Sequence, residues 1–407
     1  MERLIHIKNV SIWVVVLMLA VTAGANEKEY YSKLDPKLRL LALAKAEVMK
    51  PIKQTNSTAV QEEDDKNNST DKIDVVKYLS EKCGFEYTRD ANGLPQRPQV
   101  KCQYQPKPAG EKFNGMTAKF DCKFTLIDEN SQVKEKTLKV KYDPKRHVGG
   151  GHKEIPQAVI GTQIARLMGF HTGTYCPVDL TCLDCPSENP WSQSRSSAPA
   201  VPGQAVEFKN VVVEAKFKGY KIEDTENQNT EKPQGASFRD LNRYYPKTDS
   251  ATQMRMRAER EALTIWINFV LSQDADRHNN KLYCLKSKSA ENENEKPECL
   301  RSAFVINDYG NSFGYSSPDS KLQLSKFART ALIQTGDQIV TTGASGNAGA
   351  GHHVLSNEGI DLFVKQAEAV TDQQLSDVFN LAQIDKVSDA NVSQWIKAFR
   401  KKIERMK

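Results

Sequence analysis

The sequence predicts an α+β fold in two lobes, a β-rich N-terminal lobe followed by a helical C-terminal lobe. Short segments in which apolar and polar residues alternate are concentrated between residues 73 and 220, and a period of two indicates strands. Helical patterns dominate residues 221–407, most clearly in the segment Arg255–Leu271, which is apolar nearly all round from Ala262 onward. Because the strands come first and do not alternate with the helices, the order favours α+β over α/β.

Residues 1–25 have the features of a secretory signal peptide. Arg3 and Lys8 precede an apolar run over residues 10–20, and residues 23–25 match an A-x-A cleavage site. The run is shorter than the ~20 residues that a helix needs to cross a bilayer, so we expect cleavage and not retention as an anchor. The mature protein is therefore expected to be secreted or periplasmic, with no membrane span.

Between the signal and the folded body, residues 26–72 are expected to form a short helix and a disordered linker. Leucines between Tyr30 and Val48 recur at helical spacing, whereas residues 52–72 are polar and lack a pattern. The β-rich lobe is then expected over 73–220 and the helical lobe over 221–407.

Several elements can be placed within the two lobes from their patterns. In the first lobe we expect strands at residues 119–126, 137–142 and 211–217, and a helix at 156–168 that ends at Gly169. In the second lobe we expect the buried helix Arg255–Leu271, a short buried strand Phe304–Ile306, and helices throughout Asn357–Met406.

All eight cysteines follow the signal, and an even number in an exported chain favours disulfides. Three pairs are close in the sequence: Cys102 with Cys122, Cys182 with Cys185, and Cys284 with Cys299. The second of these is a C-x-x-C motif, which also occurs in zinc sites and redox dithiols. Since there is no second C-x-x-C and no thioredoxin-like βαβ frame, we favour a structural bridge. The sequence does not fix the partners of Cys83 and Cys176.

The charge of the chain limits the classes of partner. The formal net charge is +6, and the Lys and Arg residues are dispersed along the sequence instead of forming blocks. This distribution argues against a dedicated nucleic-acid surface. A mildly basic protein still favours anionic ligands such as phosphates.

The residues with the most chemistry follow the buried helix. Residues 272–281 read SQDADRHNNK, and Asn307-Asp308-Tyr309-Gly310 follows the short strand. Phosphoryl transfer needs carboxylate and amide oxygens to hold Mg²⁺ against nucleotide phosphates, and a carboxylate or His near the attacking hydroxyl. A core helix, an Asp/His/Asn-rich loop, a short strand and Asp-aromatic-Gly occur here in the order found in the catalytic half of a protein-kinase-like fold.

With these motifs the chain resembles the atypical kinases, in one of two registers. Asp276-Arg277-His278 is similar to the D-R-H loop of phosphatidylinositol 3-/4-kinase-like enzymes, and Asp308 then stands where their D-F-G begins. This resemblance implies catalytic roles for Asp276 and His278. In that family the metal-binding Asn falls five residues after the Asp, where this chain has Lys281, and Asn280 is one residue short.

The second register resembles the D-x-H-x-x-N loop of HipA-like kinases. Asp274 and Asn279 are five residues apart, the spacing of Asp and Asn in the protein-kinase loop H-R-D-x-x-x-x-N. Asp274 is then the catalytic Asp, Asn279 and Asp308 are the metal ligands, and Asp276 takes the place of the His. We favour this register.

Candidate nucleotide-binding residues come from the first lobe: Gly115, Lys119, Lys139, Lys141, Glu154 and Glu214. Residues 114–120 are similar to the small phosphate-loop turn of HipA-like kinases. On the next strand Lys141, with Lys139 in reserve, is where a kinase places the Lys that contacts the α- and β-phosphates. Glu154 opens the following helix and is the nearest partner for a Lys–Glu ion pair, and Glu214 lies on the strand that would lead to the hinge.

The mature chain also resembles a group of exported bacterial proteins to which no activity is assigned. The shared landmarks are Lys139-Val140-Lys141-Tyr142, Leu167-Met168-Gly169-Phe170, Cys182-x-x-Cys185-Pro186, Cys284 with Cys299, Ile306-Asn307-Asp308-x-Gly310 and Leu375-Ser376-Asp377. This resemblance implies a common fold and no particular activity.

The expected function is that of an exported, kinase-like protein that binds ATP with Mg²⁺ or Mn²⁺ and transfers a phosphoryl or AMP group to an acceptor that the sequence does not identify. The alternative is a non-catalytic extracytoplasmic binding protein on the same scaffold. The scarcity of ATP outside the cytoplasm favours the alternative. A third possibility is a structural or interaction protein whose disulfides are its main feature.

The signal peptide gives a first testable prediction. Expression with export should yield a mature chain that begins at Asn26, because cleavage is expected after Ala25. N-terminal sequencing of the exported protein checks this, and a protein that still begins at Met1 would contradict it.

Overall fold

The computed structural model describes the folded body of the chain in a series of segments. The described residues are 36–50, 74–113, 115, 117–127, 132–143, 154–187, 189–191, 195–215, 217–223, 241, 249–272, 279–288, 297–314, 322–329, 332–335, 338–341 and 355–407. The predicted signal peptide (residues 1–25), the predicted linker and the loop residues Asp274, Asp276 and His278 lie outside them.

Helices and strands both occur along the chain, so the predicted α+β class is confirmed. The helices are α2 (Pro36–Ala44), α3 (Val75–Cys83), α4 (Glu154–Leu167), α6 (Ser250–Phe269), α7 (Leu324–Arg329), α8 (Asn357–Ala369), α9 (Asp372–Leu381), α10 (Ile384–Val387) and α11 (Val392–Glu404). The strands are β1 (Thr88–Arg89), β2 (Pro95–Gln96), β3 (Gln99–Gln105), β4 (Lys119–Ile127), β5 (Val133–Lys141), β6 (Thr174–Leu183), β7 (Ala205–Ala215), β8 (Tyr220–Ile222), β9 (Asn280–Lys288), β10 (Glu298–Ile306), β11 (Leu332–Thr335) and β12 (Gln338–Thr341).

Five strands of the first half close into a small barrel in the order β3-β4-β5-β7-β6, with β6 and β3 pairing in parallel. Alternate residues along each strand point inward. The interior contains aromatic rings: the Phe120 centroid lies 5.6 Å from that of Tyr142 and 5.2 Å from that of Phe208. Because these rings fill the space between the strands, the barrel is a packed scaffold and not a ligand cavity.

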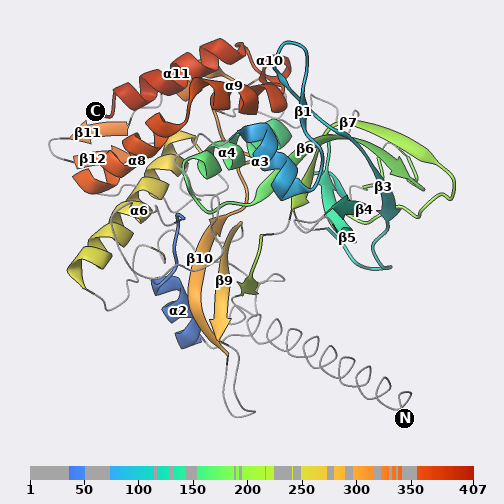
Figure 1. The fold of residues 1–407 in the computed structure, drawn as a ribbon, viewed down its shortest axis with the longest axis horizontal. Coiled ribbons are helices and arrows are strands. Elements are labelled where there is room, and N and C mark those ends of the chain that lie inside the picture. The colour runs from blue at the N-terminus through green and yellow to red at the C-terminus, as the bar shows by residue number, and fades with distance from the viewer. Residues whose placement is uncertain are drawn as a thin grey trace, which may run out of the picture.

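Helix α4 connects β5 to β6 and lies beside α3, between the barrel and the C-terminal helices (Figure 1). It begins at Glu154 and ends before Gly169, whose φ of +89° suits a residue without a side chain and stops the helix. The predicted helix at 156–168 is therefore present, shifted by one or two residues. This connection leaves the end of β5 next to the start of α4.

In the C-terminal half, α6 lies beside α8 (Figure 1), and further helices pack at the end of α6. Phe269, at the end of α6, is at the centre of this packing, since its ring lies 5.1–5.7 Å from those of Phe327, Phe363 and Phe399. Helices α8 to α11 follow one another through the predicted helical segment. Among the described helices, none has both the length and the apolar character of a membrane span.

This half also contains more strand than expected, because β10 pairs with β9 and β9 with β8. In the β9–β10 hairpin, Asn280 at the start of β9 faces Ile306 at the end of β10. The signal for β9 was weak, since its inward residues alternate over only a few positions within a polar stretch. The hairpin matters for the site, because Asn279 and Asn307 leave it at the same end.

The N-terminal helix ends at Ala44 and not at Val48 as expected. Beyond it the chain becomes extended, and Glu47 hydrogen-bonds through its backbone to β10, with Glu47 N to Ser302 O at 2.9 Å and Phe304 N to Glu47 O at 2.8 Å. Pairing with the sheet thus overrides helix propensity. The buried Arg260 of α6 donates to the carbonyl of Ala44 at 2.8 Å, which satisfies the helix C-terminus with a positive charge.

Helix α9 is fixed to the segment that precedes the barrel. Arg89 on β1 makes a bidentate pair with Asp377 of α9, at 2.9 and 2.7 Å, and the Asp377 side chain is 2% exposed. Arg97 donates from Nε to the carbonyl of Leu381 at the end of the same helix, at 2.8 Å. Two arginines therefore connect the barrel side of the molecule to the C-terminal helices.

Four disulfides form, and they include the three pairs expected from the sequence: Cys102–Cys122, Cys182–Cys185 and Cys284–Cys299. The fourth joins the two cysteines that were left over, Cys83 of α3 and Cys176 of β6. Their Cα atoms are 6.0 Å apart although 93 residues separate them. The sequence could not predict this pair, since it depends on how α3 packs against the barrel.

The carboxyl group of Glu259 on α6 gives a prediction about how the stability of the fold depends on pH. Burial raises its pKa to about 7, with a further increase from the charge of Glu47 and a partial offset from Arg255. Between pH 4.5 and 7 the folded chain holds a proton that the unfolded chain releases, so stability from this group is lost as the pH rises. We expect Glu259→Gln to raise the free energy of unfolding at pH 8 by about 1–3 kcal/mol and to change it little at pH 4.

Chemical denaturation at both pH values, with the disulfides intact, measures this difference. Glu86→Gln, at an exposed position, is the matched control, and its free energy of unfolding should stay close to that of the parent protein at both pH values. If Glu259→Gln is less stable than the parent at pH 8, the ionised carboxylate stabilises the fold. That result would contradict the proposed cost of burying its charge.

Candidate functional site

The candidate site is centred on the ammonium group of Lys141, at the end of β5. Its Nζ lies 3.7 Å from Oε1 of Glu154, the first residue of α4, and 3.7 Å from Oδ2 of Asp308, two residues beyond β10. The Lys141 side chain is 7% exposed, and the two carboxylates are about three times more exposed, at 21% and 20%. Three separate elements therefore meet around one positive charge.

A tyrosine connects this ammonium group to the backbone next to Asp308. Lys141 Nζ donates a hydrogen bond to the hydroxyl of Tyr175 on β6 at 2.9 Å, and that hydroxyl donates to the carbonyl of Asn307 at 3.0 Å. Tyr175 is buried, and Lys141 Nζ also lies 4.8 Å from the centre of its ring. Tyr175 therefore fixes the distance between the lysine and the segment that carries Asp308.

The charges around Lys141 determine its protonation. Burial alone would lower its pKa, but the negative charges of Asp308, Glu154 and Glu214 more than offset this effect, and the pKa lies well above its ordinary value. Burial raises the pKa of Tyr175 well above 10, so its phenol stays neutral. The site at neutral pH thus holds an ammonium ion and a neutral hydroxyl.

Asp308-Tyr309-Gly310 is held in one conformation by its neighbours. The Gly310 N–H donates to Asp308 Oδ1 at 2.9 Å, and a Cβ at Gly310 would overlap the side chain of Glu154. The buried Tyr309 side chain lies against Gly161 of α4, and its hydroxyl accepts a hydrogen bond from Trp266 of α6 at 3.1 Å. This tripeptide needs glycine at its third position because Glu154 occupies the space, and its aromatic residue packs between two helices.

A second ion pair lies next to the first. Glu214 on β7 is 3.5 Å from Nζ of Lys139 and accepts a hydrogen bond from Nδ2 of Asn307 at 3.4 Å. Burial would raise the pKa of Glu214, but Lys139 and Lys141 together lower it below its ordinary value. Lys139 and Lys141 therefore both contribute to the site, and Asn307 connects the second pair to the Asp308 segment.

The predicted phosphate-loop turn lies against Glu154, one of the two carboxylates next to Lys141. The Thr117 hydroxyl donates to the carboxylate of Glu154. Gly115 has a φ of +81°, and a Cβ at this position would lie 3.1 Å from Nζ of Lys119. Burial, with repulsion from Lys141, lowers the pKa of Lys119 to about 8. Gly115 thus lies next to Lys119, and Thr117 joins this turn to Glu154.

Of the catalytic and metal-binding residues predicted in this loop, Asn279 and Asn280 lie in the described part of the chain. Asn279 is half-buried and lies just outside the β9–β10 hairpin, whereas Asn280 is fully buried within it, opposite Ile306. The register of the loop stays a prediction, because Asp274 lies outside the described residues.

Sequence reasoning missed Tyr175, Thr117 and Asn307. Tyr175 is a neutral residue with no motif around it, and only the packing of β6 brings it to Lys141. Thr117 lies within the predicted phosphate-loop turn, but its hydrogen bond to Glu154 depends on how that turn packs against α4. Asn307 directly precedes Asp308, so its position in the sequence was a usable signal that we did not interpret.

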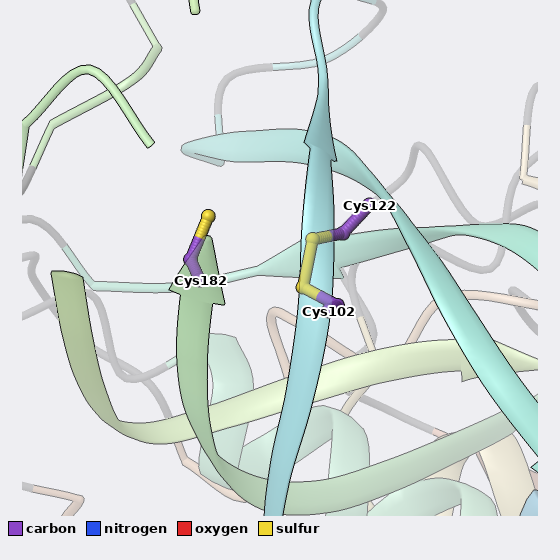
Figure 2. Close-up of side chains that lie close together, drawn as sticks. All are labelled: Cys102, Cys122 and Cys182. Atoms are coloured by element: carbon purple, nitrogen blue, oxygen red, sulfur yellow. A yellow bond between two sulfur atoms is a disulfide. The ribbon is translucent and has the colours of Figure 1, made fainter. Parts of the chain in front are cut away.

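A separate group of three cysteine sulfurs lies inside the barrel. Sulfur atoms of Cys102, Cys122 and Cys182 are within 4.8 Å of one another (Figure 2). All three are in disulfides, and a metal ion binds the thiolate form of cysteine. In this oxidised state the group is therefore not a metal site.

Solved structures that are similar to this chain include the two described here. No protein-family model and no curated protein sequence matches this chain. The Helicobacter pylori proinflammatory kinase CtkA is similar with 10% identity and a TM-score of 0.38, over 76% of this chain and 94% of that one. HipA of Shewanella oneidensis MR-1, from a complex with HipB and operator DNA, is similar with 9% identity and a TM-score of 0.30, over 74% of this chain and 67% of that one.

The role of Tyr175 can be measured by stability. Tyr175→Phe removes a hydrogen bond from a charged donor and one to a carbonyl, so we expect the free energy of unfolding to fall by about 2–4 kcal/mol. Tyr87→Phe is the matched control, because its buried hydroxyl donates only to the carbonyl of Pro177, at 3.0 Å, and its loss should cost about 1 kcal/mol. Urea denaturation gives both values, and equal losses would mean that the contact with Lys141 contributes nothing.

Proposed function

We propose that this protein is an extracytoplasmic, kinase-like protein that binds ATP with Mg²⁺ or Mn²⁺ and transfers a phosphoryl or AMP group. The observation that supports it is the ammonium group of Lys141 at 3.7 Å from the carboxylates of both Glu154 and Asp308. Phosphoryl transfer requires a positioned lysine for phosphates and a carboxylate for metal close together, and here both come from loops and strand ends of different elements.

Lys141 and the turn around Gly115 would hold the phosphates. Lys141 is charged, nearly buried and oriented by Tyr175, so little entropy is lost when it binds an anion. Lys119 lies beside Gly115, and a phosphate would favour its protonated form. Glu154 keeps Lys141 in place from the opposite side and receives a hydrogen bond from Thr117.

Asp308 and Asn279 would hold the divalent cation. Both supply oxygen donors, which Mg²⁺ and Mn²⁺ prefer. This assignment is supported by their place in the chain: Asn279 precedes β9 and Asp308 follows β10 at the same end of the hairpin. The ion would neutralise the charge that develops on the phosphates during transfer.

Asp274 would orient or deprotonate the acceptor. In phosphoryl transfer an acceptor oxygen forms a bond to the γ-phosphorus of ATP, the bond to the bridging oxygen breaks and ADP leaves. In AMP transfer the acceptor attacks the α-phosphorus and pyrophosphate leaves. Both reactions use the same lysine and metal ligands, and they differ in which phosphorus is placed next to the acceptor.

The second candidate is a binding protein that uses the same site without transfer. It is favoured by the four disulfides, which are typical of an oxidising compartment where ATP is scarce. In that case Lys141 and Asp308 would bind a phosphorylated or otherwise anionic ligand.

Incubation with ATP that carries a label on either the α- or the γ-phosphate distinguishes the transferase from the binding protein, because only transfer labels the protein or an added acceptor.

Nucleotide binding itself is tested by thermal denaturation of the mature protein with ATP and Mg²⁺ or Mn²⁺. At a ligand concentration of about 100 times the dissociation constant, binding adds roughly 2.7 kcal/mol. This corresponds to a rise in Tm of about 2–4 °C. We expect Asp308→Ala to lose the part of the rise that depends on metal, and Lys141→Met to lose most of it with or without metal.

Asp361→Ala is the matched control, since Asp361 is exposed on α8. It should keep the full shift. Absence of a shift with ATP, ADP or AMP in the parent protein, or an unchanged shift in Asp308→Ala, would contradict the proposed site.

A further inference from the structure

Two of the disulfides lie next to each other inside the barrel. Cys102–Cys122 joins β3 to β4, and Cys182–Cys185 closes the turn at the end of β6. The Cys182 sulfur is within 4.8 Å of both sulfurs of the first bridge, and Figure 2 shows the three side chains beside one another on neighbouring strands. Four sulfur atoms from three strands and one turn thus form a single cluster.

The register of the strands brings one pair of these cysteines into a position suited to a different bond. Cys102 and Cys182 are direct partners in the parallel pairing of β3 and β6, so their side chains are on the same face. Neighbouring strands are roughly 4.8 Å apart, and disulfides occur between Cα atoms about 4.4–6.8 Å apart. A Cys102–Cys182 bridge therefore needs little movement of the backbone.

The surroundings restrict which thiol can react. All four sulfur-bearing side chains are at most 3% exposed, whereas Leu183, within the C-x-x-C turn, is 38% exposed. Reduction of the Cys182–Cys185 bridge by a reagent in solvent therefore requires local opening of this surface turn. A thiol formed at Cys182 would meet the neighbouring disulfide before it meets another molecule.

We propose that these four cysteines are a thiol–disulfide exchange site, in which reduction of Cys182–Cys185 by an external dithiol passes to Cys102–Cys122. The dithiol supplies two electrons and two protons and leaves as a disulfide, and Cys182 and Cys185 become thiols. The Cys182 thiolate then attacks the Cys102 sulfur. A Cys102–Cys182 bond forms, the Cys102–Cys122 bond breaks, and Cys122 leaves as a thiolate that takes up the proton released by Cys182.

Exchange changes which strands are joined. Before it, the cross-link runs between the antiparallel strands β3 and β4; after it, the cross-link runs between the parallel strands β3 and β6, which close the barrel. The site is independent of the proposed nucleotide site and takes a dithiol or a thiol-bearing protein as its partner.

The full mature protein with Cys185→Ser tests the internal step without any reductant, because Cys182 then begins as a free thiol. The folded protein is incubated at pH 8, quenched in acid, unfolded and alkylated, and the modified cysteines are mapped by mass spectrometry. We expect the label to be divided between Cys182 and Cys122, with a Cys102–Cys182 disulfide peptide present. A label on Cys182 alone would overturn the proposal.

The matched control is Cys299→Ser, which leaves a free thiol at Cys284, outside the cluster. Its label should stay on Cys284. If Cys185→Ser does not fold, the parent protein is treated briefly with dithiothreitol, and the molecules in which one disulfide has been reduced are mapped in the same way. We expect free thiols at Cys122 and Cys185, and a species with only Cys182 and Cys185 free would reject exchange.

Discussion

The structure depends on how one buried ammonium group is neutralised. Removing a charged lysine from water costs several kcal/mol, and this cost is offset only when opposite charges and hydrogen-bond acceptors are held close to it. For Lys141 the carboxylates come from the start of α4 and from the segment after β10, and an acceptor comes from β6. The ends of the barrel strands, the helix and the hairpin must therefore meet at this position.

Other contacts keep these elements in place from a distance. Tyr309 packs between α4 and α6, so the segment with Asp308 cannot move without disturbing both helices. The extended residues after α2 pair with β10, and Arg260 holds the end of that helix. Arg89 and Asp377 connect the segment before the barrel to α9. Charged side chains thus fix the long-range contacts, while aromatic rings fill the interiors.

Much of the site was predictable because its charged residues follow local rules. Lys141 ends a strand with clear alternation, Glu154 is the acidic residue that opens the next helix, and Asp308 directly follows a buried strand and precedes glycine. Tyr175 and Thr117 could not be found in this way, since neutral residues take on such roles only through tertiary packing. The same reason applies to β9 and to the extended residues near Glu47, where pairing with distant strands decides the backbone. The two-lobed, kinase-like arrangement stays a prediction.

The bridge between Cys83 and Cys176 has a consequence for the integrity of the chain. The segment between these two positions, which are 93 apart in the sequence, includes three strands of the barrel and the whole of α4. A protease that cut any loop within this span would produce two fragments that remain covalently joined. A molecule nicked there would therefore keep its full mass until a reducing agent broke the bridge, and its barrel strands would be held together after the backbone was cut.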